Sequence, residues 1–393
     1  MIICFYILGL NSCLNIYTKK EKSTYTNIQW NNNFKNLYKK HKKYIKIAII
    51  LPFSGIYKNI SKSILQGAEL SLFDTNINNI SIIPIDTKGT KKGAIKAVQK
   101  AILKKTKLIL GPLFSHETKA ISNLFNLPPI ISFSTDPSVI KPLNIFSIGI
   151  NHEEQLKYLI KFSKKKQINT IAVILPKNSY GNYIQKILDK LNIRKTIKMI
   201  YYTQYNEKSL NLINIRKKLN NFSCQGLLIP EGGKRLYYLI SSLKYNNIPL
   251  SKLQLLGTEQ WNNKFLSKIK DISGGCFTAP MQKEKLLFIE HYKNIFHDIP
   301  HRIALLSYDA ILMIASLIKL YKNNPFQYKN IIRKQGFWGN QGLFRFTIEG
   351  TIERGIAIFR INKDGLLKLI IPAIKSFRKH EKSFIYDRNF SIN

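Results

Sequence analysis

The sequence predicts an α/β protein with two doubly wound parallel-sheet lobes, and three observations lead to this fold class. Short apolar segments alternate with amphipathic helical segments along most of the chain, as in parallel α/β sheets. The alternation restarts after Gly149, which indicates a second lobe. Residues 342–361 then change to a period of two around the turn Glu349-Gly350, which predicts a C-terminal β-hairpin.

The clearest repeating unit begins at Leu108–Leu110, an apolar run of the kind that forms a strand buried on both faces. A helical pattern follows over residues 115–125, and two prolines end it before the next strand at Ile130-Ile131. Both strands lead into hydroxyl-bearing loops, at Ser115 and Ser134. Ligands of open parallel sheets bind beyond the carboxyl ends of strands, so these loops predict half of a binding cleft.

The other elements continue this alternation. In the first lobe we expect strands at 44–51, 80–85 and 144–148, and helices at 60–72 and 94–103. In the second lobe we expect helices at 152–162, 182–191, 213–219 and 235–243, and strands at 170–175, 196–202, 226–229 and 253–256. Residues 274–280 are expected to cross between the lobes. The predicted domains are a signal segment (1–13), a tether (14–45), lobe 1 (46–148 and 279–335), lobe 2 (149–278 and 336–372, with the hairpin) and a polar tail (373–393).

The composition allows more than one core but does not favour a nucleic-acid partner. The chain has 393 residues, of which 45% are hydrophobic. Its formal net charge of +40 would suit nucleic acid, but the basic residues are spread along the whole chain. Nucleic-acid-binding proteins gather such residues in a stripe or patch. We therefore expect a solvated lysine surface and no nucleic-acid partner.

The first residues predict export. Ile2–Leu10 is apolar, too short to span a bilayer and long enough for the core of a signal peptide. It ends in Leu10-Asn11-Ser12-Cys13, which resembles a bacterial lipobox and would place lipidation on Cys13. Simple export and a misplaced start are the alternatives. Residues 14–45 are polar and aperiodic, which is typical of a tether.

The sequence contains no catalytic or metal-binding motif that we can identify. The motifs G-x-S-x-G, G-x-x-x-x-G-K-[ST] and H-E-x-x-H are absent. The four cysteines, Cys4, Cys13, Cys224 and Cys276, are too far apart for a zinc motif or a dense disulfide framework. We therefore expect no enzymatic activity, no catalytic residue, no metal and no cofactor.

Several short motifs occur in a recognisable order. They are Gly111-Pro112-Leu113-Phe114, Phe133-Ser134-Thr135-Asp136, Gly149, Pro176-Lys177-Asn178-Ser179-Tyr180-Gly181, Leu256-Gly257-Thr258, Trp261, Tyr308-Asp309-Ala310, Gly342-Leu343-Phe344-Arg345-Phe346 and Glu353-Arg354-Gly355. Over residues 46–372 this order resembles the type I periplasmic-binding-protein fold, in its leucine-binding-protein branch. It is most similar to the penicillin-binding protein activator lipoproteins.

The resemblance implies a non-enzymatic outer-membrane lipoprotein that reaches across the periplasm to a penicillin-binding protein, a peptidoglycan synthase. The alternative is the substrate-binding protein of an ABC transporter for branched-chain or related amino acids, with an ABC permease as its partner. Membrane contact is expected only through the lipid anchor. The activators of gammaproteobacteria carry an N-terminal helical-repeat domain, whereas this chain has only the polar residues 14–45 there.

The resemblance also implies a ligand site. Its residues are Ser54, Ser115, Ser134, Thr135, Tyr180, Glu259 and Trp261. Ser115, Ser134 and Thr135 would hold the carboxylate of an amino acid, Tyr180 would close from the second lobe, and Glu259 would meet the ammonium. The alternative for the hydroxyl residues is helix capping alone. A receptor predicts Glu259 across from Ser115 and Thr135, whereas an activator predicts a filled cleft or one without a paired charge.

Overall fold

The computed structural model describes residues 44–141, 143–193, 199–206, 224–263, 265–281 and 283–377. The expected signal segment with Cys13, nearly all of the tether and the helix expected at 213–219 lie outside these residues. The described chain forms a five-stranded, a seven-stranded and a three-stranded sheet.

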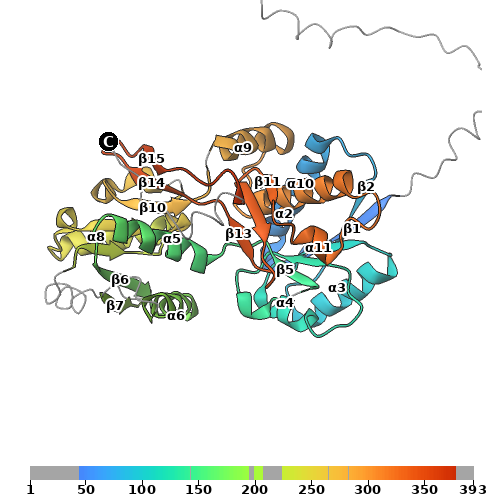
Figure 1. The fold of residues 1–393 in the computed structure, drawn as a ribbon, viewed down its shortest axis with the longest axis horizontal. Helices are drawn as coiled ribbons and strands as arrows, with labels where there is room; N and C mark the ends of the chain where they lie inside the picture. The colour runs from blue at the N-terminus through green and yellow to red at the C-terminus, as the bar shows by residue number, and fades with distance from the viewer. Residues whose placement is uncertain are drawn as a thin grey trace, which may run out of the picture. The chain divides into compact units, whose positions relative to one another are not determined.

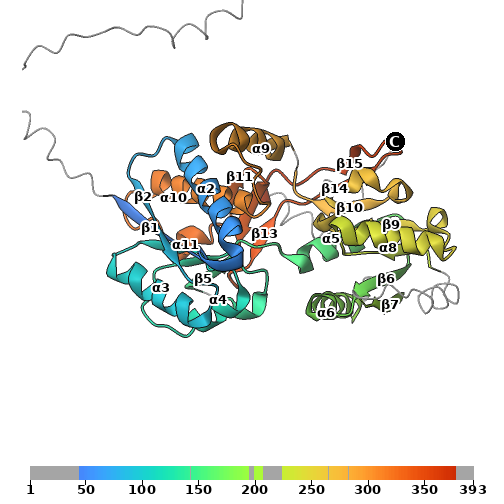
Figure 2. The ribbon, with the colours of Figure 1, turned by 180° about the vertical axis from the view of Figure 1, so that it is seen from behind.

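The first sheet is parallel throughout, with strand order β2-β1-β3-β4-β5. Its strands are β1 (Ile45–Leu51), β2 (Ile80–Asp86), β3 (Leu108–Leu110), β4 (Ile130–Ser132) and β5 (Ile145–Ser147). Ile47 and Ile49 of β1 pack on one face with α2 (Lys58–Thr75) and α10 (Ala304–Leu320), which run side by side in Figure 1. Ala48 and Ile50 pack on the other face with α3 (Lys91–Leu103) and α4 (Ser115–Ile121), seen in Figure 2. The continuous apolar run is therefore buried on both faces, as a doubly wound sheet requires.

The second sheet has the order β15-β14-β10-β9-β8-β6-β7. Its strands are β6 (Thr170–Pro176), β7 (Met199–Tyr205), β8 (Gly226–Leu228), β9 (Gln254–Gly257), β10 (Cys276–Ala279), β14 (Ala357–Ile361) and β15 (Leu367–Ile371). The first five of these are parallel, and β14 and β15 are antiparallel to their neighbours. Helices α5 (His152–Lys165) and α6 (Ser179–Ile193) cover one face, and α8 (Gly233–Tyr245) covers the other. These two layered sheets confirm the predicted fold class.

The hairpin belongs to the small sheet, and its place differs from the one expected. Strands β11 (Phe337–Gly339), β12 (Gly342–Phe346) and β13 (Ile352–Arg354) pair antiparallel. We expected 336–372 to lie wholly in the second lobe, which is wrong for β11–β13. Phe344 and Phe346 point into the core of the first sheet, where the Phe346 ring lies 5.3 Å from Phe146. Only β14 and β15 return to the second sheet.

The other connections complete the architecture. The segment expected to be a crossover, 274–280, contains β10, a strand of the second sheet. Helix α9 (Lys283–Phe296) follows it and packs on α2 and α10 through Phe288 and Tyr292. A short helix, α11 (Tyr328–Ile331), precedes the small sheet. No helix in the described stretches is long and apolar enough to cross a membrane.

Candidate functional site

Two hydroxyl-bearing loops of the first sheet meet at the carboxyl ends of β3 and β4. Ser115 Oγ lies 2.8 Å from Ser134 Oγ. Ser134 is almost completely buried, and its Oγ also accepts the N–H of Asp136 at 3.2 Å. Thr135, between them, is exposed. The structure therefore brings Ser115 and Ser134 together as a hydroxyl pair at the edge of the sheet, with Thr135 beside it.

Ser54, which follows β1, is exposed and takes part in holding Asp86. Asp86 Oδ1 accepts the N–H groups of Phe53 at 2.9 Å and Lys88 at 2.8 Å. Burial opposes ionisation of Asp86, but these bonds and those from Ser54 outweigh it and lower the pKa of Asp86. Ser54 is thus engaged in fixing the loops that follow β1 and β2.

A second polar group lies at the carboxyl ends of β6, β7 and β8. The Tyr205 hydroxyl donates a hydrogen bond to Glu231 Oε2, and Tyr180 donates to the carbonyl of Pro230 at 3.0 Å. Glu231 is 8% exposed, and its Oε1 accepts the N–H of Gly232 at 3.3 Å. Burial and the nearby charge of Glu231 both raise the pKa of Tyr180. Tyr180, Tyr205 and Glu231 therefore form one compact cluster, which we call the Glu231 cluster.

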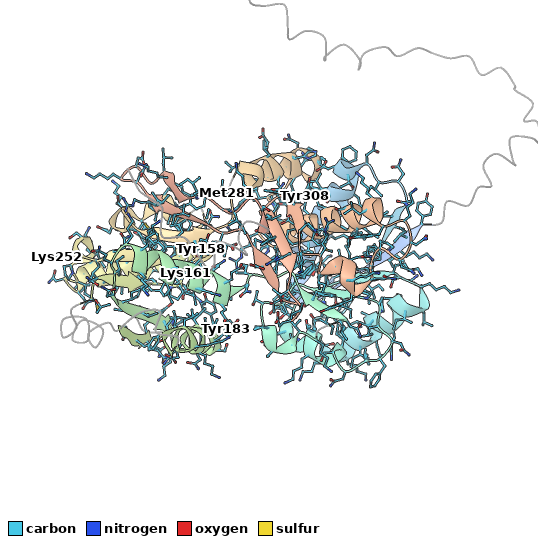
Figure 3. The ribbon with its side chains drawn as sticks, in the orientation of Figure 1. Tyr158, Lys161, Tyr183, Lys252, Met281 and Tyr308 are labelled. Carbon is cyan, nitrogen blue, oxygen red and sulfur yellow. The ribbon has the colours of Figure 1, made fainter. Side chains whose placement is uncertain are left out.

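The loops of the two sheets approach each other beside these groups. Burial and the charges of Asp136 and Glu153 raise the pKa of Tyr183 to about 12, which places Tyr183 near the loop that contains Ser134. Figure 3 shows Tyr183 at the side of α6 that is nearer the first sheet. Arg302, just before α10, donates from Nη1 to Gln260 in the loop after β9 at 3.2 Å. The loop that contains Ser134 and Asp136 and helix α6, which carries Tyr180 and Tyr183, therefore approach each other between the two sheets.

Glu259 is the neighbour of Gln260 in the turn after β9, and its side chain faces the segments that cross between the sheets. Gln155 Nε2 donates to Glu259 Oε2 at 3.0 Å, and the Glu259 N–H donates back to Gln155 Oε1 at 3.4 Å. Both residues line a small space together with Gly149 and Pro280 of the crossing segments. Burial lowers the pKa of Lys285, and the charge of Glu259 opposes this effect. Glu259 already has an amide partner and a cation nearby, which argues against a role in binding the ammonium of a ligand.

Trp261 was expected to bind ligand, and this is wrong. Its side chain is fully buried in the core of the second sheet, and its Nε1 donates to the carbonyl of Ile229 at 2.9 Å. A Cβ at Gly257 would lie 2.2 Å from the indole, and one at Gly275 would lie 2.9 Å from it. The two glycines make room for Trp261, which is therefore a packing residue.

Sequence reasoning missed Glu231 and Tyr205. The strand at 226–229 was expected, and Glu231 comes just after β8, so the rule applied to the other strand ends would have found it. The strand expected at 196–202 extends to Tyr205, so the predicted strand ended too early to reveal that residue.

A cavity of about 780 Å³ lies between α5, the small sheet and the loop after β4. Its wall on α5 includes Glu153, Glu154 and Lys161, and Figure 3 shows Lys161 near Tyr158 on this helix. The volume suits a small ligand. However, Glu153 pairs with Lys190 at 2.9 Å, and none of the expected ligand-binding residues lines the cavity. We therefore place the candidate site at the strand ends.

Glu154, in the wall of this cavity, predicts a pH dependence of stability. Its carboxyl accepts the N–H of Arg354 at 3.1 Å, and burial raises its pKa from 4.5 to about 8, opposed by this bond and assisted by the charge of Glu353. The folded state thus binds more protons than the unfolded state between these values, so this contribution to stability is lost as the pH rises through them. We expect Glu154→Gln to gain about 2 kcal/mol over the wild type at about pH 9, and little at about pH 5.

Urea unfolding at the two pH values measures this difference. The matched control is Glu153→Gln, which removes a carboxylate from a solvent-exposed ion pair on the same helix and should change stability by less than about 1 kcal/mol. An equal pH response of wild type and Glu154→Gln would show that Glu154 does not cause the effect.

Comparisons with known proteins support the fold described above. Residues 44–365 match the family described as periplasmic binding protein. An uncharacterised protein of Rickettsia prowazekii (strain Madrid E) is 24% identical over 339 residues, which cover 82% of this chain and 88% of that protein.

Solved structures match along most of their length. The leucine binding protein LivK of Thermotoga maritima is 16% identical, with a TM-score of 0.61, covering 84% of this chain and 98% of that one. An ABC-transporter solute binding protein of R. palustris, solved in complex with benzoate, is 13% identical, with a TM-score of 0.60. The match covers 84% of this chain and 97% of that one. At these identities the likeness shows a shared fold.

Proposed function

Because the chain belongs to the periplasmic binding protein family, we propose that it is the substrate-binding protein of an ABC transporter for branched-chain or related amino acids. The observation that carries the proposal is the buried Glu231 carboxylate at the strand ends, held by Tyr205, with the Ser115–Ser134 hydroxyl pair on the first sheet. A buried carboxylate can pair with an ammonium through charge-assisted hydrogen bonds. Hydroxyl groups can donate to a carboxylate.

This proposal replaces the role that the sequence first favoured, the activation of a penicillin-binding protein. The similar solved structures carry names that refer to leucine binding and ABC transport, which supports a transport role. The fold is typical of binding proteins without enzymatic activity. An ABC permease is accordingly the partner that we propose. The family also suggests an exported, periplasmic protein, and attachment of lipid at Cys13 is part of our proposal.

The class of ligand that we propose follows from the groups on the two sides of the site, Glu231 on the second sheet and the hydroxyl pair on the first. An amino acid has both an ammonium for Glu231 and a carboxylate for the hydroxyl pair. An aromatic carboxylate such as benzoate has no ammonium, so its binding would leave the buried Glu231 without a partner cation, which is costly. We therefore expect free amino acids to bind in preference to benzoate.

Thermal unfolding of the full chain against leucine, isoleucine, valine and benzoate tests the proposal. Binding to the native state raises the midpoint, and a hundredfold excess over Kd adds about 2.7 kcal/mol of stability. A shift with at least one amino acid and none with benzoate is the expected result. A shift with benzoate alone would contradict the ligand class. No shift with any compound would contradict the transport role, and a pull-down of the peptidoglycan synthase would then test the activator role.

A further inference from the structure

The amino ends of the five strands in the first sheet form a continuous edge, opposite to the edge that carries the site. Backbone hydrogen bonds join the segments that enter this edge. Ile45 donates to Asn79 at 2.7 Å, and Lys107 donates to Lys46 at 2.8 Å. In the same way, Ile109 donates to Pro129 at 2.9 Å, and Ile130 donates to Asn144 at 2.8 Å. The strands are parallel, so their five entry segments lie next to one another. We call this surface the strand-entry edge.

Each entry segment exposes at least one large apolar side chain to solvent, and the segment before β3 exposes Ile102 in addition to Leu103. The most exposed one on each segment is Tyr44 before β1, Phe73 before β2, Leu103 before β3, Phe125 before β4 and Leu143 before β5. Leu103 is 82% and Phe125 is 88% exposed. Single exposed apolar side chains are ordinary on a protein surface. One on every segment of the same edge is a pattern that favours an apolar or interfacial partner.

The strand-entry edge is also strongly basic. Five exposed lysines occupy it: Lys46, Lys104, Lys105, Lys107 and Lys141. In the sequence of the five segments (44–46, 72–79, 102–107, 121–129 and 140–144) the only acidic residue is Asp74. Asp74 accepts the hydroxyl of Tyr308 at 2.6 Å, and His291 Nδ1 lies 3.5 Å from it. The only acidic side chain of these five segments is therefore engaged in contacts within the protein.

Residues 1–43 join the protein at this same edge, since Tyr44 immediately precedes β1. In Figures 1 and 2 the first residues of β1 lie at the end of the first sheet that points away from α5 and α8. An extended chain spans at most about 3.3–3.6 Å per residue, so an anchor at Cys13 could reach on the order of 100 Å. An anchor with this reach would not determine which face of the protein lies against the membrane. The charged and apolar side chains on the surface of the described residues must therefore determine that face.

From this juxtaposition we propose that the strand-entry edge binds the surface of an anionic lipid bilayer. The lysines attract the charged headgroups, and the apolar side chains enter the headgroup region. This contact adds to the lipid anchor that the sequence predicts at Cys13. It orients the carboxyl ends of the strands, with the candidate site, away from the lipid surface.

The test uses the full chain with Cys13→Ser, so that acylation cannot contribute to binding. Cosedimentation with phosphatidylglycerol vesicles and with phosphatidylcholine vesicles measures the partition coefficient. We expect binding to the anionic vesicles alone, weakened by salt. Lys104→Glu/Lys107→Glu should lower the coefficient by about tenfold or more. Leu103→Ser/Phe125→Ser should lower the binding that remains at high salt.

The matched control is Lys164→Glu/Lys166→Glu, which makes the same charge change at the end of α5, on the second sheet. It should retain the binding of the parent protein. Equal losses in both lysine variants would overturn the proposal, because the net charge alone would then explain the binding. Absence of binding to the anionic vesicles would also overturn it. Binding to duplex DNA that is as strong as binding to the anionic vesicles, and that the lysine variant and the apolar variant of the edge reduce equally, would also overturn it. The edge would then be a site for polyanions in general.

Discussion

Glu231→Gln is expected to remove most of the stabilisation that an amino acid gives to the protein. The substitution keeps the size of the side chain and its ability to accept from Tyr205, but it removes the negative charge that would pair with the ammonium. A hydrogen bond to a charged group contributes about 1.5–3 kcal/mol, so the affinity should fall by a factor on the order of 10 to 100. Thermal shifts recorded over a range of leucine concentrations measure this factor.

Glu259→Gln is the matched control, because it makes the same chemical change at the acidic residue that the sequence favoured. Its partner Gln155 can still hydrogen-bond to an amide, so we expect the leucine affinity to stay within about twofold of the wild type. The opposite outcome, in which Glu259→Gln loses binding and Glu231→Gln keeps it, would restore the original assignment of the ammonium site.

The comparison of these two residues shows where sequence reasoning stops. Both are acidic residues just after strands of one sheet, and local pattern cannot separate them. Gln155, which donates a hydrogen bond to Glu259, is 104 residues away from it along the chain. Tyr205, which contacts Glu231, lies at the end of another strand. The choice depends on contacts that only the folded chain creates.

The fold class, in contrast, follows from local information. The run of residues 47–51 is apolar throughout, and in the structure its successive residues enter two different cores. Such a strand needs helices on both faces, which alternating helical segments supply. The hairpin turn could also be predicted from local sequence. The lobe to which the hairpin belongs could not be predicted in this way, because it depends on the packing of Phe344 and Phe346 in the core of the first sheet.

Trp261 illustrates the same limit for an aromatic residue near a strand end. Its position after β9 is compatible with stacking on a ligand and with packing in the core. The decisive neighbours are Gly257 and Gly275, whose missing side chains leave room for the indole. A glycine at each of these positions is visible in the sequence, but their distance to the ring is a property of the fold.

Arg354→Met should cause the largest loss of stability among the substitutions considered for this protein. Arg354 Nη1 lies 2.9 Å from Asp309 Oδ2, with 9% of the arginine side chain and 0% of the aspartate side chain exposed. The guanidinium also lies 4.9 Å from the centre of the Phe344 ring. Methionine keeps the apolar stem but leaves Asp309 buried without its cation, which should cost about 3–5 kcal/mol.

Urea unfolding near neutral pH measures this loss, and Lys244→Met is the matched control. The Lys244–Asp271 pair is similarly short, at 2.7 Å, but 65% of the lysine side chain is exposed. Such surface pairs contribute about 0–1 kcal/mol. The double variant Arg354→Met/Asp309→Leu should recover part of the stability, because it removes the stranded carboxyl as well. Similar losses in Arg354→Met and Lys244→Met would mean that burial does not set the cost. In that case, the contact between α10 and β13 would have to be stabilised chiefly by apolar packing around Phe344.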